Sequence, residues 1–372
     1  MDGLFENIKT ISSNFDIPGE MINYGEISVG HINKTYYTVY SDNGQEKRYI
    51  LQNINTEVFK NPKELMSNVI KVTSFLRKKI EAEGGDPDRE TLTVFPTKGG
   101  ESCYFAPDGA CWRVYNFVEN SFSYDSIEYP ELFYSAGEAF GGFLGLLSDF
   151  PMDDLYETIP DFHDTRKRVA AFEDSVNADV MSRAAGAAAE IEYVRSVKDR
   201  TGIIVDLLKD NKIPLRVTHN DTKLNNIMFD KDTKKAMCVV DLDTVMPGSS
   251  LYDFGDAIRY GANTGAEDEK DISKVNLDIE LYRQYIRGYL SKAAKSLTEC
   301  EVKNLPLSSW MMTFECGMRF LTDYLNGDTY FGISYPEHNL DRCRSQFKLA
   351  QDIDAKTDIL NEITAAAYEE FK

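Results

Sequence analysis

The sequence predicts an α+β protein in two parts, a small β-rich N-terminal part and a larger, mainly helical C-terminal part. Up to about residue 120, short apolar or aromatic segments with the alternation of strands stand between turn signals. From Glu131 onward, apolar residues recur every three or four positions, as on one face of a helix. The chain has 372 residues, 42% of them hydrophobic, which is ample for one large core or two domains.

The N-terminal part is expected to be an antiparallel sheet with one inserted helix. Asp42-Asn43-Gly44 is a strong hairpin signal between two of the strands. The helix is expected to begin at Asn61-Pro62, because Asn caps helices and Pro fits their first turn. Pro107-Asp108-Gly109 marks a later turn. The expected strands are residues 27–29, 36–40, 48–54, 91–97, 102–106 and 111–118.

The hinge between the two parts is expected in the polar stretch 119–124. It divides the chain into an N-terminal lobe of residues 1–118 and a C-terminal lobe of residues 125–372. A short β-ribbon is expected within the helical lobe. The expected helices of that lobe are one beginning at Glu131 and further ones in 163–211, 279–296 and 308–325.

Composition excludes several classes of partner. The 41 Lys and Arg stand against 61 Asp and Glu, a formal charge of −20, so a nucleic acid or an anionic membrane surface is an unlikely ligand. The acidic N-terminus lacks the positive charge of a secretory signal, and the six cysteines show no metal spacing, which favours a cytoplasmic protein with reduced thiols. No long apolar seam indicates an oligomer, so a monomer is expected.

One short segment carries the residues of a catalytic site. His219, Asp221 and Asn226 form the pattern H-x-D-x-x-x-x-N, followed by the apolar run Ile227-Met228-Phe229. A second apolar run ends in Asp241-Leu242-Asp243. If the two runs form a hairpin centred between Thr233 and Lys234, Asn226 falls opposite Asp241, and Asp221 can reach the same end of the ribbon.

These residue types suit phosphoryl transfer. An amide oxygen and a carboxylate are hard ligands for Mg²⁺, which takes few protein ligands and completes its shell with phosphates. Asp221 can deprotonate an attacking hydroxyl, and Lys223 supplies positive charge for a phosphoryl group. His219 is interpreted as a buried scaffold of the loop. Asp243 is either functional or a structural carboxylate, and the sequence leaves both open.

Three runs resemble a known family. Lobe order and the H-x-D-x-x-x-x-N loop look like the bilobal protein-kinase-like fold of the aminoglycoside phosphotransferase and choline kinase superfamily. Within that superfamily, the sequence resembles the bacterial N-acetylhexosamine 1-kinases more closely. The runs that carry this resemblance are residues 219–226, HNDTKLNN; 241–248, DLDTVMPG; and 319–331, RFLTDYLNGDTYF.

The resemblance implies transfer of the γ-phosphate of ATP to the anomeric hydroxyl of N-acetylglucosamine or N-acetylgalactosamine. Asp221 would accept the proton, and Asn226 with Asp241 would hold Mg²⁺. Arg319 and Tyr330 would bind the sugar. The remaining implied positions are Gly30, Lys34 and Thr35 over the phosphates, the Asn116 carbonyl and Val118 amide at the adenine, and Asp253 and Asp256 bracing the catalytic loop.

One departure and several alternatives stand beside this reading. Protein kinases carry a Lys on the third strand for the α- and β-phosphates, and here Gln52 occupies the nearest position. Glu64 is explained by its place at a helix start. Arg319 could instead pair with Glu315 and Asp323 on its own helix. The alternative functions are a kinase of a cationic amine, such as choline or an aminoglycoside, and a catalytically silent nucleotide-binding module.

Overall fold

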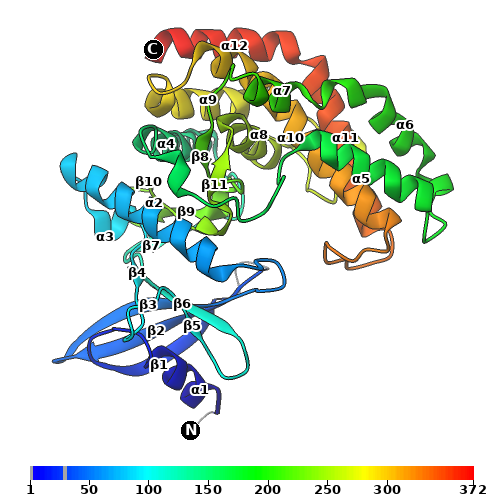
Figure 1. The fold of residues 1–372 in the computed structure, drawn as a ribbon. Helices are drawn as coiled ribbons and strands as arrows, with labels where there is room; N and C mark the ends of the chain where they lie inside the picture. The colour runs from blue at the N-terminus through cyan, green and yellow to red at the C-terminus, as the bar shows by residue number, and fades with distance from the viewer. Residues whose placement is uncertain (1–2, 28–31) are drawn as a thin grey trace. The chain divides into compact units, whose positions relative to one another are not determined.

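The computed structural model describes residues 3–27 and 32–372, and it divides into two compact units. The N-terminal unit contains residues 1–123, 149–159 and 227–247, and the C-terminal unit contains the remaining segments 124–148, 160–226 and 248–372. One unit is built on an antiparallel sheet and the other on helices, so the predicted α+β class is confirmed (Figure 1). The lobe boundaries at 118 and 125 stay a prediction.

The sheet of the N-terminal unit has the strand order β1-β2-β3-β6-β4, and β5 pairs with β6. Asn43 and Gly44 both have positive φ angles, 49° and 82°, as the predicted two-residue hairpin turn requires. The strands are β1 Glu20–Ile27, β2 Lys34–Asp42, β3 Gln45–Ile54, β4 Val94–Phe95, β5 Tyr104–Phe105 and β6 Cys111–Asn116. The first strand ends at Ile27, the first residue of the expected strand, whose residues 28–29 lie outside the described residues; the fourth strand is much shorter than predicted.

Three helices, not one, accompany this sheet: α1 Gly3–Ser12, α2 Pro62–Ala82 and α3 Pro87–Glu90. Helix α2 begins at Pro62 as expected, but Asn61 does not cap it through its side chain; the Asn61 amide donates to Glu64 instead, at 3.2 Å. Helix α1 buries Ile8 and Ile11 against aromatic residues of the strands. Helices α1 and α3 were not predicted, because each is short.

The ribbon predicted around residue 233 exists with a different register. Strand β9 Ile227–Asp230 pairs with β10 Ala236–Val239. The prediction required Ile227 opposite Val240 and Phe229 opposite Cys238, whereas Ile227 pairs with Val239 and Phe229 with Ala236. The turn is centred one residue earlier than predicted, and a bulge between Ala236 and Cys238 reduces the difference in register from two positions to one. The expected hinge is also partly ordered as a strand, since β7 Ser121–Phe122 pairs with β9.

The C-terminal unit is mainly helical and contains the short strand β8 Arg216–Thr218; strand β11 Met246–Gly248 crosses the division between the units, which falls after Pro247. Residues 163–211 form three helices rather than long ones, and the helix predicted at 308–325 begins earlier, at a capping box of Thr298 and Glu301. Helices α10 and α11 run side by side (Figure 1). The helices are α4 Pro130–Leu146, α5 Thr165–Ala178, α6 Ala188–Val197, α7 Ile203–Lys209, α8 Ser250–Gly261, α9 Ile279–Ala293, α10 Glu299–Leu325, α11 His338–Ala355 and α12 Thr357–Phe371.

Helices α4 and α9 cross at glycines. A Cβ atom added at Gly288 would collide with the backbone carbonyl of Tyr134, and one at Gly137 with that of Tyr285. The two backbones therefore approach more closely than any larger residue allows. Phe140 and Phe143 of α4 reach His219 from this helix pair, so the crossing fixes a wall of the catalytic loop. In the part of the chain that the structure describes, no helix has the length and apolarity needed to cross a membrane.

Substitution of Gly288 by Ala is expected to destabilise the protein by about 1–3 kcal/mol, because backbone carbonyls cannot move away from the new methyl group as a side chain could. Gly142→Ala in α4 is the matched control. No atom lies within 4 Å of its added Cβ, so the helix propensity of Ala should leave the free energy of unfolding unchanged or raised by up to about 1 kcal/mol. Urea denaturation of both variants checks this, and equal midpoints would show that the crossing is not tight.

Candidate active site

The loop that carries the H-x-D-x-x-x-x-N residues follows β8 and is anchored by His219. The His219 side chain is fully buried, edge-on to the rings of Phe140 and Phe143 at 5.6 and 6.0 Å between centroids. Its Nδ1 accepts a hydrogen bond from the backbone N–H of Asp221, at 3.3 Å. In this position the imidazole supports the loop from inside and faces apolar rings, which suits a scaffold rather than a proton donor.

Two carboxylates of the first turns of α8 hold the backbone of this loop. Asp253 accepts from the N–H groups of His219 and Asn220, at 2.8 and 2.7 Å. Asp256 accepts from the N–H of Thr222 at 3.1 Å. Asn220 has a positive φ of 62°, a conformation that costs free energy for a residue other than Gly. The carboxylates therefore compensate for a strained turn that points Asp221 away from the core.

The pKa values of these two carboxyl groups shift in opposite directions. Burial raises the pKa of Asp253 to about 6, although the charge of His219 and the two backbone N–H groups act against it. Burial also acts on Asp256, but the guanidinium of Arg259, bonded to Asp256 Oδ1 at 2.9 Å, holds the pKa of that carboxyl below its usual value. One of the two bracing groups therefore titrates close to neutral pH.

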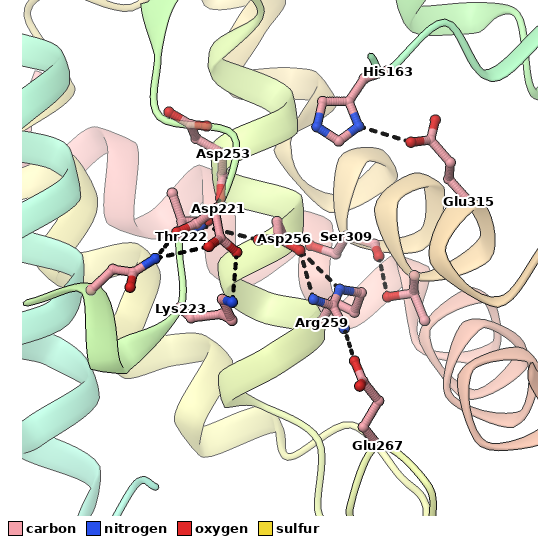
Figure 2. A network of polar contacts seen from close by, with 12 residues as sticks. His163, Asp221, Thr222, Lys223, Asp253, Asp256, Arg259, Glu267, Ser309 and Glu315 are labelled. Carbon is pink, nitrogen blue, oxygen red and sulfur yellow. Dashed lines mark hydrogen bonds and ion pairs between the residues drawn. The ribbon is translucent and has the colours of Figure 1, made fainter. Parts of the chain in front are cut away.

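Asp221 itself lies between a cation and an amide (Figure 2). Lys223 Nζ is 3.0 Å from Asp221 Oδ1, and Asn226 Nδ2 donates to both the carbonyl oxygen and Oδ2 of Asp221, at 2.8 and 3.0 Å. Because the amide nitrogen of Asn226 is engaged, its Oδ1 is left to accept from another group or to bind a cation. The structure thus brings together three of the predicted residues, Asp221, Lys223 and Asn226.

The donor chemistry at the ends of the ribbon fits Mg²⁺. Asn226 directly precedes β9, and Asp241 follows β10 by two residues, so the amide oxygen and the carboxylate come from the same pair of strands. Within residues 3–27 and 32–372, no group of three or more His, Cys, Asp or Glu side chains could hold a metal ion. The pairing of Asn226 and Asp241 at Mg²⁺ stays a prediction.

The N-terminal unit places Asp243 in a contact that the sequence did not reveal. Asp243 is buried and forms an ion pair with Arg113 of β6, and it accepts from Asn33 Nδ2 at 2.6 Å. Sequence reasoning missed Arg113 because it stands within an apolar run and not in a motif. The signal that could have found it is a charged residue at an inward position of a strand that reads as buried on both sides.

The residues predicted at the nucleotide are placed as follows. Gly30 lies outside the described residues. Lys34 and Thr35 begin β2, and Thr35 Oγ1 accepts from Gln52 Nε2 at 2.9 Å. The Asn116 side chain is buried and bonded to Thr93 N and Asp88 O, and the Val118 carbonyl accepts from Ser121. The roles of the Asn116 carbonyl and Val118 amide toward adenine stay predictions.

The predicted acceptor residue Arg319 lies among aromatic rings. Its guanidinium carbon is 5.6, 5.8 and 5.4 Å from the ring centroids of Phe162, Tyr330 and Phe331. The alternative pairing along the helix is not formed: Glu315 instead binds His163 and Thr165, at 2.8 and 2.5 Å.

Asp323, the other candidate partner of Arg319, is also engaged. It accepts from the backbone N–H groups of Thr329, Tyr330 and Phe331, at 2.8–2.9 Å, and so fixes the segment after α10. Tyr330 remains 65% exposed, so its ring is available to a ligand.

A second arginine near Arg319 was not predicted. Arg168 of α5 donates to the carbonyl of Phe162 at 2.8 Å, and its buried Nε has no hydrogen-bond partner among the described residues. Burial, and then the charge of Arg319, lower the pKa of Arg168. Two guanidinium groups close enough to repel each other therefore share this part of the C-terminal unit, and nothing in the local sequence pattern marks Arg168.

The acceptor cluster is the group formed by Arg168, Arg319, Phe162, Tyr330 and Phe331. Helix α10 links this cluster to the loop that carries Asp221. Burial raises the pKa of Cys316 to about 11, and the charges of Arg259 and Arg319 both act against that rise. Arg259 is the partner of Asp256, so Cys316 lies within the electrostatic reach of both groups of residues. His163 and Glu315 appear beside the same loop (Figure 2).

Comparison with known proteins assigns the family. Residues 24–296 match the model of the phosphotransferase enzyme family, and the chain belongs to that family. It is therefore a phosphotransferase.

Solved structures share the fold at low sequence identity. A choline kinase from Cryptosporidium parvum is 12% identical, with a TM-score of 0.57 and 98% and 99% of the two chains covered. An aminoglycoside 2′-phosphotransferase in complex with GDP is 10% identical, with a TM-score of 0.61 and 93% and 98% covered. A spectinomycin phosphotransferase in complex with ADP and spectinomycin is 11% identical, with a TM-score of 0.54 and 95% and 98% covered.

The raised pKa of Asp253 predicts a pH-dependent contribution to stability. Because its folded pKa of about 6 exceeds the ordinary value of 3.8, folding takes up a proton between these values. The contribution of Asp253 is therefore fully present below about pH 4 and is lost as pH rises through 6. Urea denaturation of the wild type and Asp253→Asn from pH 4.5 to 7.5 should show the wild type losing stability relative to the variant as pH rises. A relative gain would mean that the folded pKa is lowered.

Proposed function

We propose that this phosphotransferase is an N-acetylhexosamine 1-kinase, which transfers the γ-phosphoryl group of ATP to the anomeric hydroxyl of N-acetylglucosamine or N-acetylgalactosamine. The observation that carries the choice of acceptor is the pair Arg168 and Arg319, neither of which forms an ion pair within the residues that the structure describes. The charge of Glu315 acts on both guanidinium groups, but its oxygens are bonded to His163 and Thr165.

The electrostatics of this cluster favour a neutral acceptor over a cation. Two guanidinium groups repel choline or an aminoglycoside, whereas they donate hydrogen bonds to the hydroxyl groups and the acetamido carbonyl of a sugar. The exposed ring of Tyr330 and its neighbour Phe331, whose ring centroids lie 4.7 Å apart, offer apolar surface to the face of a pyranose. The net charge of −20, by contrast, does not distinguish a neutral sugar from a cationic acceptor.

The proposed reaction assigns a task to each residue of the loop. Asp221 accepts the proton of the sugar hydroxyl while the hydroxyl oxygen of the sugar bonds to the γ-phosphorus. The bond from that phosphorus to the bridging oxygen breaks, and ADP leaves. Asn226 orients Asp221 through its amide nitrogen, and Lys223 offsets negative charge at the same carboxylate. Asn226 Oδ1 and the carboxylate of Asp241 would hold Mg²⁺, which screens the charge of the nucleotide phosphates.

We further propose a cellular environment, a set of partners and an oligomeric state for the protein. All six cysteines are free thiols, which supports a reducing, cytoplasmic environment. The proposed partners are ATP and the sugar alone, without nucleic acid or membrane, and the proposed state is a monomer.

An ATP-consumption screen tests the proposed acceptor. N-acetylglucosamine and N-acetylgalactosamine should stimulate turnover, and plain hexoses, choline and kanamycin should not. Asp221→Asn is the control for chemistry and should lower kcat by roughly a hundredfold or more while leaving nucleotide affinity nearly unchanged. Stimulation by choline or kanamycin alone would refute the sugar assignment, and a near-normal rate of Asp221→Asn would refute its role as base.

Removal of the guanidinium at 319 should affect the acceptor and not the nucleotide. Arg319→Met is expected to raise KM for the N-acetyl sugar by about tenfold to a hundredfold, the loss typical of a charged hydrogen bond, with KM for ATP unchanged. Arg195→Met is the matched control, because Arg195 pairs only with Glu173 at the surface. Initial-rate kinetics with both substrates varied measure the difference. An unchanged KM for the sugar would remove Arg319 from the acceptor site.

A further inference from the structure

A row of polar side chains crosses three strands of the N-terminal unit. Thr35 of β2 lies opposite Gln52 of β3, and Gln52 lies opposite Arg113 of β6. Gln52 donates to Thr35 Oγ1 at 2.9 Å through its Nε2. Its Oε1 accepts from Nε and Nη2 of Arg113, at 3.1 and 2.9 Å. Gln52 thus holds the Arg113 guanidinium through its amide oxygen, while its amide nitrogen is bonded to Thr35.

Arg113 is a buried cation with strong reasons to stay charged. Its side chain is 1% exposed, and besides Gln52 it contacts Asp243 and the sulfur of Met66 in α2. Burial acts to lower the pKa of Arg113, but the charges of Asp243 and then Asp241 outweigh it, and the pKa is raised. Both carboxylates that end the ribbon therefore lie within electrostatic reach of this one guanidinium.

The contacts of Asp243 tie the same turn to the segment before β2. Asp243 Oδ2 accepts from Asn33, and Asn33 Oδ1 in turn accepts from the backbone N–H of Asn55 at 2.9 Å. Asp241, two residues earlier, has a φ of 59°, in the left-handed region that residues other than Gly seldom adopt. The turn that carries Asp241 is thus anchored through Asp243 on Arg113 and Asn33.

An ion pair as buried as this one is not explained by stability. Replacing a buried pair with apolar residues of similar volume is often neutral or stabilising, because desolvation of both charges offsets their attraction. The sheet could therefore be built without Arg113.

The guanidinium of Arg113 and the carboxylates of Asp241 and Asp243 together carry a charge of −1. A bound divalent cation would change this charge to +1, which suits a polyphosphate.

We propose that Arg113 takes over, from the neighbouring strand, the task that a third-strand lysine performs in protein-kinase-like folds: it positions the Asp241–Asp243 turn and supplies the positive charge required for a magnesium nucleotide. Gln52 then fixes the guanidinium of Arg113 in place, and the absence of a lysine at position 52 does not weaken nucleotide binding. The inference rests on the proposed use of a magnesium nucleotide, but it does not depend on the acceptor. Arg113 is a positioning residue, because it acts through Asp243.

Binding of Mg·ADP to the whole protein, measured by titration calorimetry, tests the proposal. Arg113→Met should weaken binding at least tenfold. Adding Gln52→Lys to Arg113→Met returns a cation to the third strand and should recover most of that loss, which no purely structural role of Arg113 predicts. Arg216→Met is the control, since Arg216 is also buried and paired with Glu301, in the other unit, and it should lower Tm without changing the Kd for Mg·ADP.

The outcomes separate the proposal from its alternatives. An unchanged Kd in folded Arg113→Met would overturn it, and so would a weakened Kd that Gln52→Lys does not restore. If Arg113→Met does not fold, Gln52→Leu removes the two guanidinium contacts of residue 52 and should weaken Mg·ADP binding by about threefold to tenfold; an unchanged Kd there would equally overturn it. Because no acceptor is present, failure of the sugar screen leaves this result standing, whereas absence of Mg·ADP binding to the wild type overturns both proposals.

Discussion

The catalytic loop depends on two carboxylates that accept hydrogen bonds from its backbone. Asp253 and Asp256 project from the start of α8, and between them they bind the N–H groups of residues 219, 220 and 222. Without these acceptors, the left-handed turn at Asn220 would leave three buried donors unpaired, at a cost of about 1–3 kcal/mol each. The position of Asp221 is therefore set from beneath by α8, and α8 in turn packs against α10 at Gly255, where no side chain fits.

The two units divide the charges according to the proposed chemistry. In the C-terminal unit the acidic groups near the acceptor cluster are engaged by neighbouring residues, and Arg168 and Arg319 remain as donors. In the N-terminal unit a single buried guanidinium, Arg113, serves two carboxylates. Under the proposed function, negative charge would serve a cation and positive charge would serve phosphate and sugar oxygens, although the whole chain carries a charge of −20. The proposal therefore rests on the local arrangement of charges and not on the net charge.

Local signals allowed much of this to be predicted. The hairpin at Asn43-Gly44, helix α2 and the grouping of Asp221, Lys223 and Asn226 follow from turn chemistry, periodicity and motif spacing. The ribbon register was wrong because the polar run 230–235 does not fix where the turn is centred, and the bulge leaves no trace in an apolar alternation. Arg113 and Arg168 were missed because their importance comes from residues distant in sequence, such as Asp243 and Arg319. The dual use of Gln52 also depends on strand neighbours that only the sheet brings together.

The claim that α8 holds the loop is tested most directly by amide hydrogen exchange of residues 219, 220 and 222. Strong protection of these three amides is expected in the wild type. Asp253→Ala should lose protection selectively at residues 219 and 220, while the amide of residue 222, which Asp256 binds, is less affected and the amides of α10 stay protected. Equal protection of amides 219 and 220 in both proteins would contradict this account, because the carboxylate of Asp253 would then not be what fixes the loop.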